Sequence, residues 1–185
     1  MTSAQPLWRE KVVTGVVREP QGLCGRVGFD TYDRHVRPIP PLWTSVIAAG
    51  QRGLVHATGG PRDYPGRRVL AVGLGVGAAA LYAAVGWKFT KARTTIDPRA
   101  PHRVTTLVTS GVFSRSRNPI YVADAIILAA HAAWLGRPLA LLGVPALVGA
   151  LHPQIRAEET ALQERFGREY ESYVARVPRW VGPRG

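Results

Sequence analysis

The segment Arg-Ser-Arg-Asn-Pro-Ile-Tyr brings two guanidinium groups to the start of an apolar stretch of the chain. Asn118 followed by Pro119 is typical of an N-cap and a first-turn proline, so a helix is predicted to begin there. Arg115 and Arg117 precede that start, and Tyr121 follows it. Helical N–H groups, the positive end of the helix dipole and two guanidinium groups together favour an anion. The segment therefore predicts a site for a carboxylate or phosphate ligand.

A pair of glutamates, Glu158 and Glu159, is the second group with chemical potential. Glu158 shares one helical stripe with an apolar residue every four positions, while Glu159 lies about 100° around the helix. A carboxylate on an apolar stripe is costly unless it is paired. We expect Glu158 either to pair with Arg117 or to receive the hydroxyl or cationic groups of a ligand. Gly167 is predicted to end or bend this helix, and the apolar stripe consists of Leu162, Phe166 and Tyr170.

Residues 69–87 contain no charged side chain. A helix of this length spans about 28 Å, close to the hydrocarbon thickness of a bilayer. Arginines flank one end, and Trp87, Lys88 and Lys91 flank the other, as in apolar spans with aromatic and snorkelling ends. The alternative is a buried helix of a soluble core, but the many glycines and alanines suit close helix packing in lipid better. We predict a membrane helix.

Two further apolar stretches, residues 120–135 and 139–151, are separated by Gly-Arg-Pro. Each is short for a membrane span, but together they predict a helical hairpin that crosses the bilayer and returns. Pro145 is expected to kink the second arm. The predicted fold class is therefore all-α: an integral membrane helical bundle with a transmembrane hairpin and cytosolic amphipathic C-terminal helices.

The distribution of charge predicts an orientation. The formal net charge is +12, and the hairpin tip carries only Arg137. By the positive-inside rule, the basic loop before the hairpin and the basic tail after it are cytosolic. Attraction to anionic lipid is a secondary interpretation, and a nucleic-acid partner is disfavoured because no basic helix or aromatic-basic strand pattern occurs. The basic residues of the loop and tail are Lys88, Lys91, Arg93, Arg99, Arg103, Arg115, Arg117, Arg156, Arg165, Arg168, Arg176 and Arg179.

Residues 1–66 form a poorly defined N-terminal segment, and residues 67–185 form the predicted membrane domain. Residues 42–56 resemble a degraded or re-entrant membrane segment, but Gln51, Arg52 and His56 argue against a clean span. No signal-peptide pattern is recognised. With 46 % hydrophobic and 19 % charged residues, the chain is neither a disordered tail nor a highly charged RNA-binding arm. Cys24 is the single cysteine, which excludes an intramolecular disulfide framework and a cysteine-based zinc site.

The order of these elements resembles the isoprenylcysteine carboxyl methyltransferase family and its bacterial relatives, which are also similar to phospholipid methyltransferases. The resemblance covers residues 87–180. It implies an integral membrane enzyme of the bacterial inner membrane that uses S-adenosyl-L-methionine. The cofactor would lie at the cytosolic face, enclosed by the hairpin and the C-terminal helices. The methyl acceptor would be an amphiphilic or small apolar molecule, with membrane lipid as the other partner.

The resemblance also implies roles for individual residues. Arg117, Tyr121 and Glu158 are the implied catalytic residues, and the same three also belong to the implied cofactor-binding set. Asn118 stands where the isoprenylcysteine enzymes usually have histidine, which disfavours an isoprenylcysteine substrate, and Ala123 replaces a frequent glycine. The matching motifs are Arg117, Asn118, Pro119 and Tyr121; Glu158 and Glu159; and Phe166, Gly167, Tyr170 and Tyr173. The remaining implied cofactor-binding residues are Asn118, Pro119, Glu159 and Tyr170.

The sequence is also compatible with two alternatives to a methyltransferase. One is a membrane oxidoreductase similar to steroid reductases, which would use a nicotinamide cofactor, although no Rossmann glycine fingerprint is present. The other is a non-catalytic membrane scaffold. Asp124 and His131 lie on one face of the predicted hairpin, and an ionisable residue in a membrane span is a functional candidate; stabilisation of Asp124 by the helix start is the structural alternative. No metal site is predicted, because His102, His131 and His152 lack metal-ligand spacing.

Overall fold

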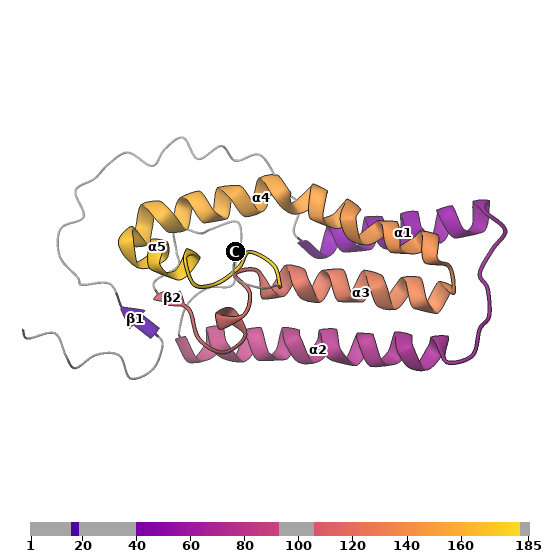
Figure 1. Cartoon of the computed structure of the whole chain (residues 1–185), viewed down its shortest axis with the longest axis horizontal. Coiled ribbons are helices and arrows are strands. Elements are labelled where there is room, and N and C mark those ends of the chain that lie inside the picture. Colours follow the sequence, from indigo (N-terminus) through magenta and orange to yellow (C-terminus); the bar gives the residue numbers. More distant parts are fainter. Residues whose placement is uncertain (1–15, 19–39, 93–105, 182–185) are drawn as a thin grey trace, which may run out of the picture.

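Helices make up most of the part of the chain that the structure describes, namely residues 16–18, 40–92 and 106–181 of a computed structural model (Figure 1). A short antiparallel pair of strands joins Val16 to Val108 and Arg18 to Thr106. The basic residues Arg93, Arg99 and Arg103 lie outside the described residues. The elements are β1 (Val16–Arg18), α1 (Pro40–Ala57), α2 (Arg67–Ala92), β2 (Thr106–Val108), η2 (Gly111–Ser114), α3 (Pro119–Leu135), η3 (Pro138–Leu142), α4 (Gly143–Phe166) and α5 (Arg168–Val174).

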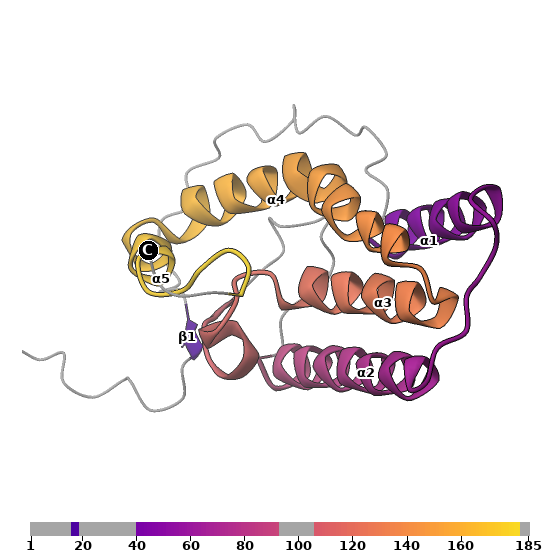
Figure 2. The same cartoon turned by 45° about the vertical axis from the view of Figure 1, so that its right-hand side comes forward.

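The four long helices alternate in direction around α3. Thr44 contacts Asp124 and Gln51 contacts His131, so α1 and α3 run the same way. Helix α2 runs oppositely, because its first residue Arg67 reaches the Trp134 carbonyl near the end of α3. Helix α4 returns along α3 after η3, and α2 lies at one edge of the molecule with α3 between it and α4 (Figures 1 and 2).

Two apolar clusters hold α3 to its neighbours. The larger one joins α3 and α4 and is covered by side chains of α1, including Trp43 and Ile47. The smaller one packs Val55 of α1 against the ends of α3 and η3. Helix α1 is thus part of the same packed unit as the hairpin. The buried residues of the larger cluster are Tyr121, Leu128, Leu147, Leu151 and Ile155.

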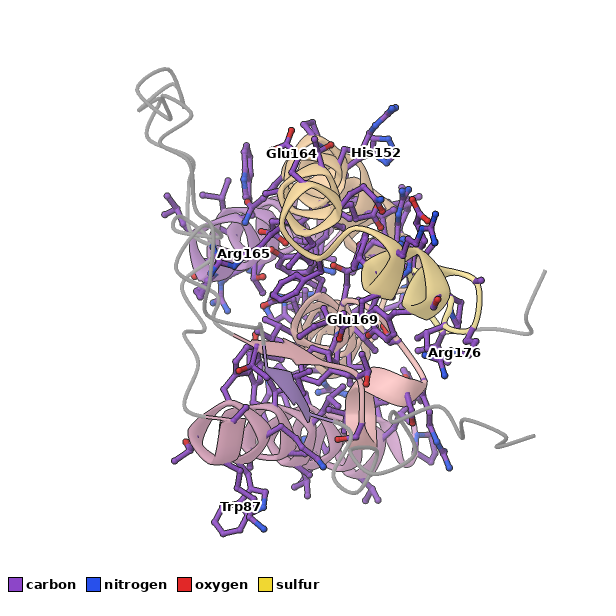
Figure 3. The ribbon with its side chains drawn as sticks, turned by 90° about the vertical axis from the view of Figure 1, so that its left-hand side faces the viewer. Trp87, His152, Glu164, Arg165, Glu169 and Arg176 are labelled. Carbon is purple, nitrogen blue, oxygen red and sulfur yellow. The ribbon has the colours of Figure 1, made fainter. Side chains whose placement is uncertain are left out.

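Two segments are long and apolar enough to cross a membrane, α2 and the continuous stretch Pro138–Phe166 formed by η3 and α4. Only 17 % of the most apolar window of α2 is buried. A core helix of a soluble protein would be mostly buried, so the apolar outer face of α2 suits lipid. Trp87 projects away from the other helices in Figure 3, and further exposed apolar residues of α2 are Val69, Leu70, Val72 and Val76.

The prediction of a separate helix for the two glutamates was wrong. The second apolar arm and the glutamate segment form one helix, α4 (Gly143–Phe166), because no glycine separates Leu151 from Glu158 and most intervening residues tolerate a helix. Pro145 lies in the first turn, where proline is tolerated, so it does not kink the helix. Pro153 lies in the interior of α4, beyond its first turn. Helix α4 bends along its length in Figure 2. Gly167 ends α4 with a φ of 48°, as predicted.

Gln51 cross-links α1 to the hairpin. Its side chain is 3 % exposed, and its amide nitrogen donates to the carbonyls of Leu128 at 3.1 Å and Ala140 at 2.6 Å. Its amide oxygen lies 2.8 Å from Nδ1 of His131. Residues 42–56 are therefore part of a regular helix, and the glutamine that argued against a clean span has buried polar partners there. A side chain at Gly143 would collide with Gln51.

Two arginines bind backbone carbonyls at the end of the molecule where α1 and α3 finish. Arg67 pairs with Asp63 at 2.5 Å and donates to the Trp134 carbonyl, and Arg137 donates to the Thr58 carbonyl. These carbonyls lie at the ends of α3 and α1, where unsatisfied acceptors and the negative end of the helix dipole attract cations. Both of these arginines are thus bound to backbone acceptors.

Replacing Gln51 with leucine is expected to lower the free energy of unfolding by about 1–3 kcal/mol, because His131 and the Ala140 carbonyl lose a buried partner. Chemical unfolding in detergent, followed by circular dichroism, measures this change. Ser45→Ala on the exposed face of α1 is the matched control and should change the stability by less than about 0.5 kcal/mol. Equal stability of the two variants would contradict the cross-link.

Candidate functional site

The start of α3 lies against the segment that follows α5. We call residues 175–181 the C-terminal strap. The backbone N–H of Arg117 donates to the Pro178 carbonyl at 3.0 Å, and the Asn118 side-chain amide donates to the Arg179 carbonyl at 3.0 Å. Ser116 donates to the same Arg179 carbonyl at 3.3 Å. These bonds hold the strap against residues 116–118, which lead into α3.

Helix α3 begins at Pro119, which confirms the predicted start. The predicted capping role of Asn118 was wrong, because its side chain makes no capping hydrogen bond. The amide nitrogen of the same side chain donates instead to the strap. Pro119 is buried as the first helical residue.

Glu159 is held between two arginines. Arg117 Nη1 donates to Oε1 of Glu159 at 2.8 Å. Arg179 donates through Nε to Oε1 at 2.9 Å and through Nη2 to Oε2 at 2.5 Å. The Arg117 and Glu159 side chains are only 13 % and 17 % exposed, so screening by solvent is limited. The carboxylate raises the pKa of Arg179, and we call these three residues the arginine–glutamate clamp.

Pairing with Arg117 was one of the two alternatives for Glu158, and it is not the one observed, because Arg117 pairs with Glu159. The two glutamates point in different directions around α4: Glu159 meets Arg117 just before α3, and Glu158 meets Tyr121 in the first turn of α3. Arg115 was predicted to supply the second guanidinium, but it is exposed. Arg179 of the strap takes that place in the clamp.

Glu158 forms a second, adjoining group with Tyr121 and Gln154. Its Oε1 accepts a hydrogen bond from the Tyr121 hydroxyl at 2.7 Å and one from Gln154 Nε2 at 3.0 Å. Gln154 Nε2 also donates to the Tyr121 hydroxyl oxygen at 3.0 Å. Tyr121 and Gln154 are 4 % and 7 % exposed. Two partners of the Glu158 carboxylate on the apolar stripe are thus neutral hydrogen-bond donors.

Tyr170 and Tyr173 of α5 pack against the C-terminal strap. Both are 3 % exposed and pack with Leu107 and Val177. Burial raises the pKa of Tyr170, while the neighbouring Arg117 opposes this shift. The Tyr173 hydroxyl donates to the Phe113 carbonyl at 2.7 Å, which ties α5 to η2.

The structure thus gathers the residues that the resemblance implied as catalytic or cofactor-binding at one end of the α3–α4 pair. The arginine–glutamate clamp contains Arg117 and Glu159, with Tyr170 beside Arg117. The adjoining group contains Tyr121 and Glu158. Sequence reasoning missed Arg179 and Gln154. Gln154 precedes Glu158 by one helical turn on the same face, a spacing that was available as a signal. Arg179 had no such signal, because it reaches Glu159 from a distant part of the sequence.

Asp124 lies one turn beyond Tyr121 on α3. Its carboxylate is 1 % exposed, and Oδ1 accepts hydrogen bonds from Thr44 at 2.8 Å and Tyr82 at 2.7 Å. The expectation that the helix start stabilises Asp124 in the first turn was wrong, since hydroxyl groups of two other helices do so. Within residues 40–92 and 106–181, no three His, Cys, Asp or Glu side chains gather as a metal site would require.

Comparisons with known proteins identify a family for the segment that carries the site. A family model described as phospholipid methyltransferase matches residues 67–169. That range is more than half of the chain and contains α2, α3, α4 and both glutamates. A Haemophilus influenzae protein described as uncharacterized is 41 % identical over 63 residues, which are 34 % of this chain and the whole length of that relative.

Replacing Glu159 with alanine is expected to release the C-terminal strap, because Arg179 loses its carboxylate partner. Loss of about 1.4 kcal/mol in the clamp raises the open population about tenfold, so trypsin should cleave after Arg179 about tenfold faster. Mass spectrometry of a limited digest in detergent measures this rate. The control is Glu164→Ala on the exposed side of α4, and identical cleavage of both variants would refute the clamp.

Proposed function

Because the chain belongs to the phospholipid methyltransferase family, we propose that it is a membrane-embedded enzyme that transfers a methyl group from S-adenosyl-L-methionine to an amphiphilic or small apolar acceptor. The family match confirms the resemblance found in the sequence. The observation that carries the proposal is the adjacency of the clamp to the Tyr121–Glu158–Gln154 group at the start of α3.

The proposed enzyme is an integral protein of a bacterial inner membrane. Helix α2 and the η3–α4 segment cross the bilayer. Helices α3 and α1 pack beside them and also cross it. The end that carries the site is cytosolic, because most of the basic side chains of the tail lie there. The last turn of α4, which contains Arg165, and helix α5, which Arg176 follows, lie at this end (Figure 1), and Figure 3 views the molecule from it. The methyltransferase unit comprises residues 67–185, with α1 of the preceding segment packed against it.

The residues present suit the polar groups of the proposed cofactor. S-Adenosylmethionine carries a carboxylate, an ammonium group and ribose hydroxyls. Arg117 and Arg179 already surround one carboxylate, that of Glu159, and therefore suit another. Arg117 Nε is buried and has no hydrogen-bond partner among the described residues, so it remains available as a donor. Glu158 and Tyr121 would take the ammonium group or a hydroxyl.

The remaining members of the proposed cofactor-binding set hold these groups in place. Asn118 fixes the strap that carries Arg179, and Pro119 sets the start of α3. Glu159 orients the two guanidinium groups, and Tyr170 packs beside Arg117. The site thus places its charged groups before a ligand enters, which reduces the cost of ordering them on binding.

The proposed chemistry requires positioning rather than a metal or a covalent intermediate. When bound, the cofactor supplies an electrophilic methyl group on a sulfonium. The chain must align donor and acceptor, and such alignment contributes several kcal/mol in well-oriented reactions. Glu158 and Gln154 fix the Tyr121 hydroxyl, and Glu159 fixes Arg117. We propose Arg117, Tyr121 and Glu158 as the residues closest to the reaction.

A matched ligand panel tests the choice of cofactor. S-Adenosylhomocysteine is expected to raise the melting temperature of the protein in detergent, because it carries the carboxylate, ammonium and ribose groups that the site suits. NADPH is expected to leave it unchanged. Stabilisation by NADPH alone would select a reductase similar to steroid reductases, and stabilisation by neither ligand would select a non-catalytic scaffold.

Two substitutions test the assigned residues. Glu158→Gln and Arg117→Ala are each expected to weaken S-adenosylmethionine binding about tenfold or more, because each removes a charged hydrogen-bond partner. Isothermal titration calorimetry in detergent measures the affinity, and membrane fractionation checks insertion. Glu164→Gln, an exposed glutamate of the same helix, is the control. Unchanged affinity of both variants would remove these assignments.

A further inference from the structure

Arginines gather at the end of the molecule where α1 and α3 finish, opposite the proposed cofactor site (Figure 1). Residues 52–68 and 134–142 make up this end, which we call the far end. They contain five arginines and one acidic residue, Asp63. The far end therefore has a strong excess of positive charge. The five arginines are Arg52, Arg62, Arg67, Arg68 and Arg137.

Two of these arginines have partners within the protein, and three do not. Arg67 and Arg137 bind backbone carbonyls, and Arg67 also pairs with the single acid of the far end. The side chains of Arg52, Arg62 and Arg68 are exposed. Among the described residues, these three have no hydrogen-bond or ion-pair partner. Their charges are therefore uncompensated by the chain around them.

Backbone and side-chain contacts hold all three arginines near the end of α3. The backbone N–H of Arg62 donates to the Leu135 carbonyl at 3.1 Å. Arg68 is the second residue of α2, whose first residue bonds to the end of α3. Arg52 follows Gln51, which bonds α1 to the hairpin. Two helices and the loop between them thus each present one unpaired arginine at the far end.

Aromatic and apolar side chains border the far end. Trp134 and Tyr64 are 51 % and 43 % exposed. Exposed tryptophan and tyrosine are typical of the level of the lipid head groups, where long basic side chains also reach out of the apolar layer. The far end is therefore expected to lie among head groups rather than in bulk water. The exposed apolar residues next to it are Val69, Leu70, Leu139, Leu141 and Leu142.

The charge of the far end selects between classes of lipid. Guanidinium groups bind phosphate through paired hydrogen bonds. A zwitterionic head group also brings a cation, and the one acid of the far end is already paired with Arg67. Nothing at the far end therefore compensates that cation, whereas a head group with a net negative charge meets only complementary charge.

We propose that the far end binds an anionic phospholipid of the outer leaflet, with Arg52, Arg62 and Arg68 as the side chains that bind its head group. This surface lies at the opposite end of α3 from the proposed cofactor site. The inference therefore goes beyond methyl transfer and takes from the proposed function only the placement in the membrane. Bound lipid would neutralise the repulsion among these arginines and so stabilise the far end.

Phosphatidylglycerol and phosphatidylcholine with identical acyl chains test the proposal on the full chain in neutral detergent. Native mass spectrometry is expected to show that the wild type retains phosphatidylglycerol in preference to phosphatidylcholine. The far-end variant, Arg52→Gln with Arg62→Gln and Arg68→Gln, is expected to bind phosphatidylglycerol about tenfold more weakly or worse, because each arginine contributes to the attraction. The variant should lose the preference.

A matched variant controls for net charge. Arg115→Gln with Arg156→Gln and Arg168→Gln removes three exposed arginines from the part of the chain outside the far end. It should keep the preference for phosphatidylglycerol. Equal binding of the two lipids by the wild type, an unchanged preference in the far-end variant, or an equal loss in the control variant would each overturn the proposal.

Substitution of the same three arginines by lysine guards against a merely structural effect. Arg52→Lys with Arg62→Lys and Arg68→Lys keeps the charge, so it should retain a preference for phosphatidylglycerol that the glutamine variant lacks. Circular dichroism checks that both variants are folded. Loss of the preference to the same extent in the lysine and glutamine variants would contradict recognition by charge and overturn the proposal.

Thermal shifts with two soluble ligands separate this inference from other accounts. Inorganic phosphate is expected to leave the melting temperature of the wild type unchanged. Stabilisation by phosphate that the far-end variant loses would identify a site for a soluble anion and overturn the lipid proposal. S-Adenosylhomocysteine should stabilise the wild type and the far-end variant equally. Its failure to stabilise either would refute the proposed function and leave the result with lipids standing.

Discussion

The ion pairs of Glu159 with Arg117 and Arg179 connect three parts of the chain that are far apart in sequence. Glu159 belongs to α4, Arg117 precedes α3, and Arg179 lies in the C-terminal strap. A carboxylate that accepts from two guanidinium groups is strongly oriented, and breaking such a pair would leave partly buried charge. The same contact therefore closes the fold at this end and arranges the cationic groups proposed to bind the cofactor.

Polar contacts also organise the apolar part of the molecule. Lipid does not drive helices together by the hydrophobic effect, so packing and interhelical hydrogen bonds must determine their register. Gln51 fixes α1 against the hairpin, and Asp124 receives hydroxyls from α1 and α2. Both lie on or against α3, which explains why the central helix has neighbours on several sides. The Gln51 side chain uses both its amide nitrogen and its amide oxygen. Asp124 Oδ2 has no hydrogen-bond partner among the described residues.

The sequence predicted local features better than long-range pairings. The start of α3 at Pro119 and the end of α4 at Gly167 follow from short-range backbone preferences, and both are observed. The sequence left the partner of Arg117 open, because helical periodicity places a side chain on a face but does not specify which face meets another helix. The pairing of Arg179 with Glu159 was not predicted for the same reason. Gln51 argued against a membrane helix because its buried partners, His131 and two carbonyls, are contributed by other segments.

Hydrogen–deuterium exchange with and without S-adenosylhomocysteine tests the central claim most directly. The claim is that the start of α3, the glutamate turn of α4 and the C-terminal strap form one ligand site. We expect the ligand to slow amide exchange in all three segments together, around residues 116–122, 154–160 and 176–181. Protection confined to another region of the protein, or no protection in a sample that binds the ligand, would contradict it.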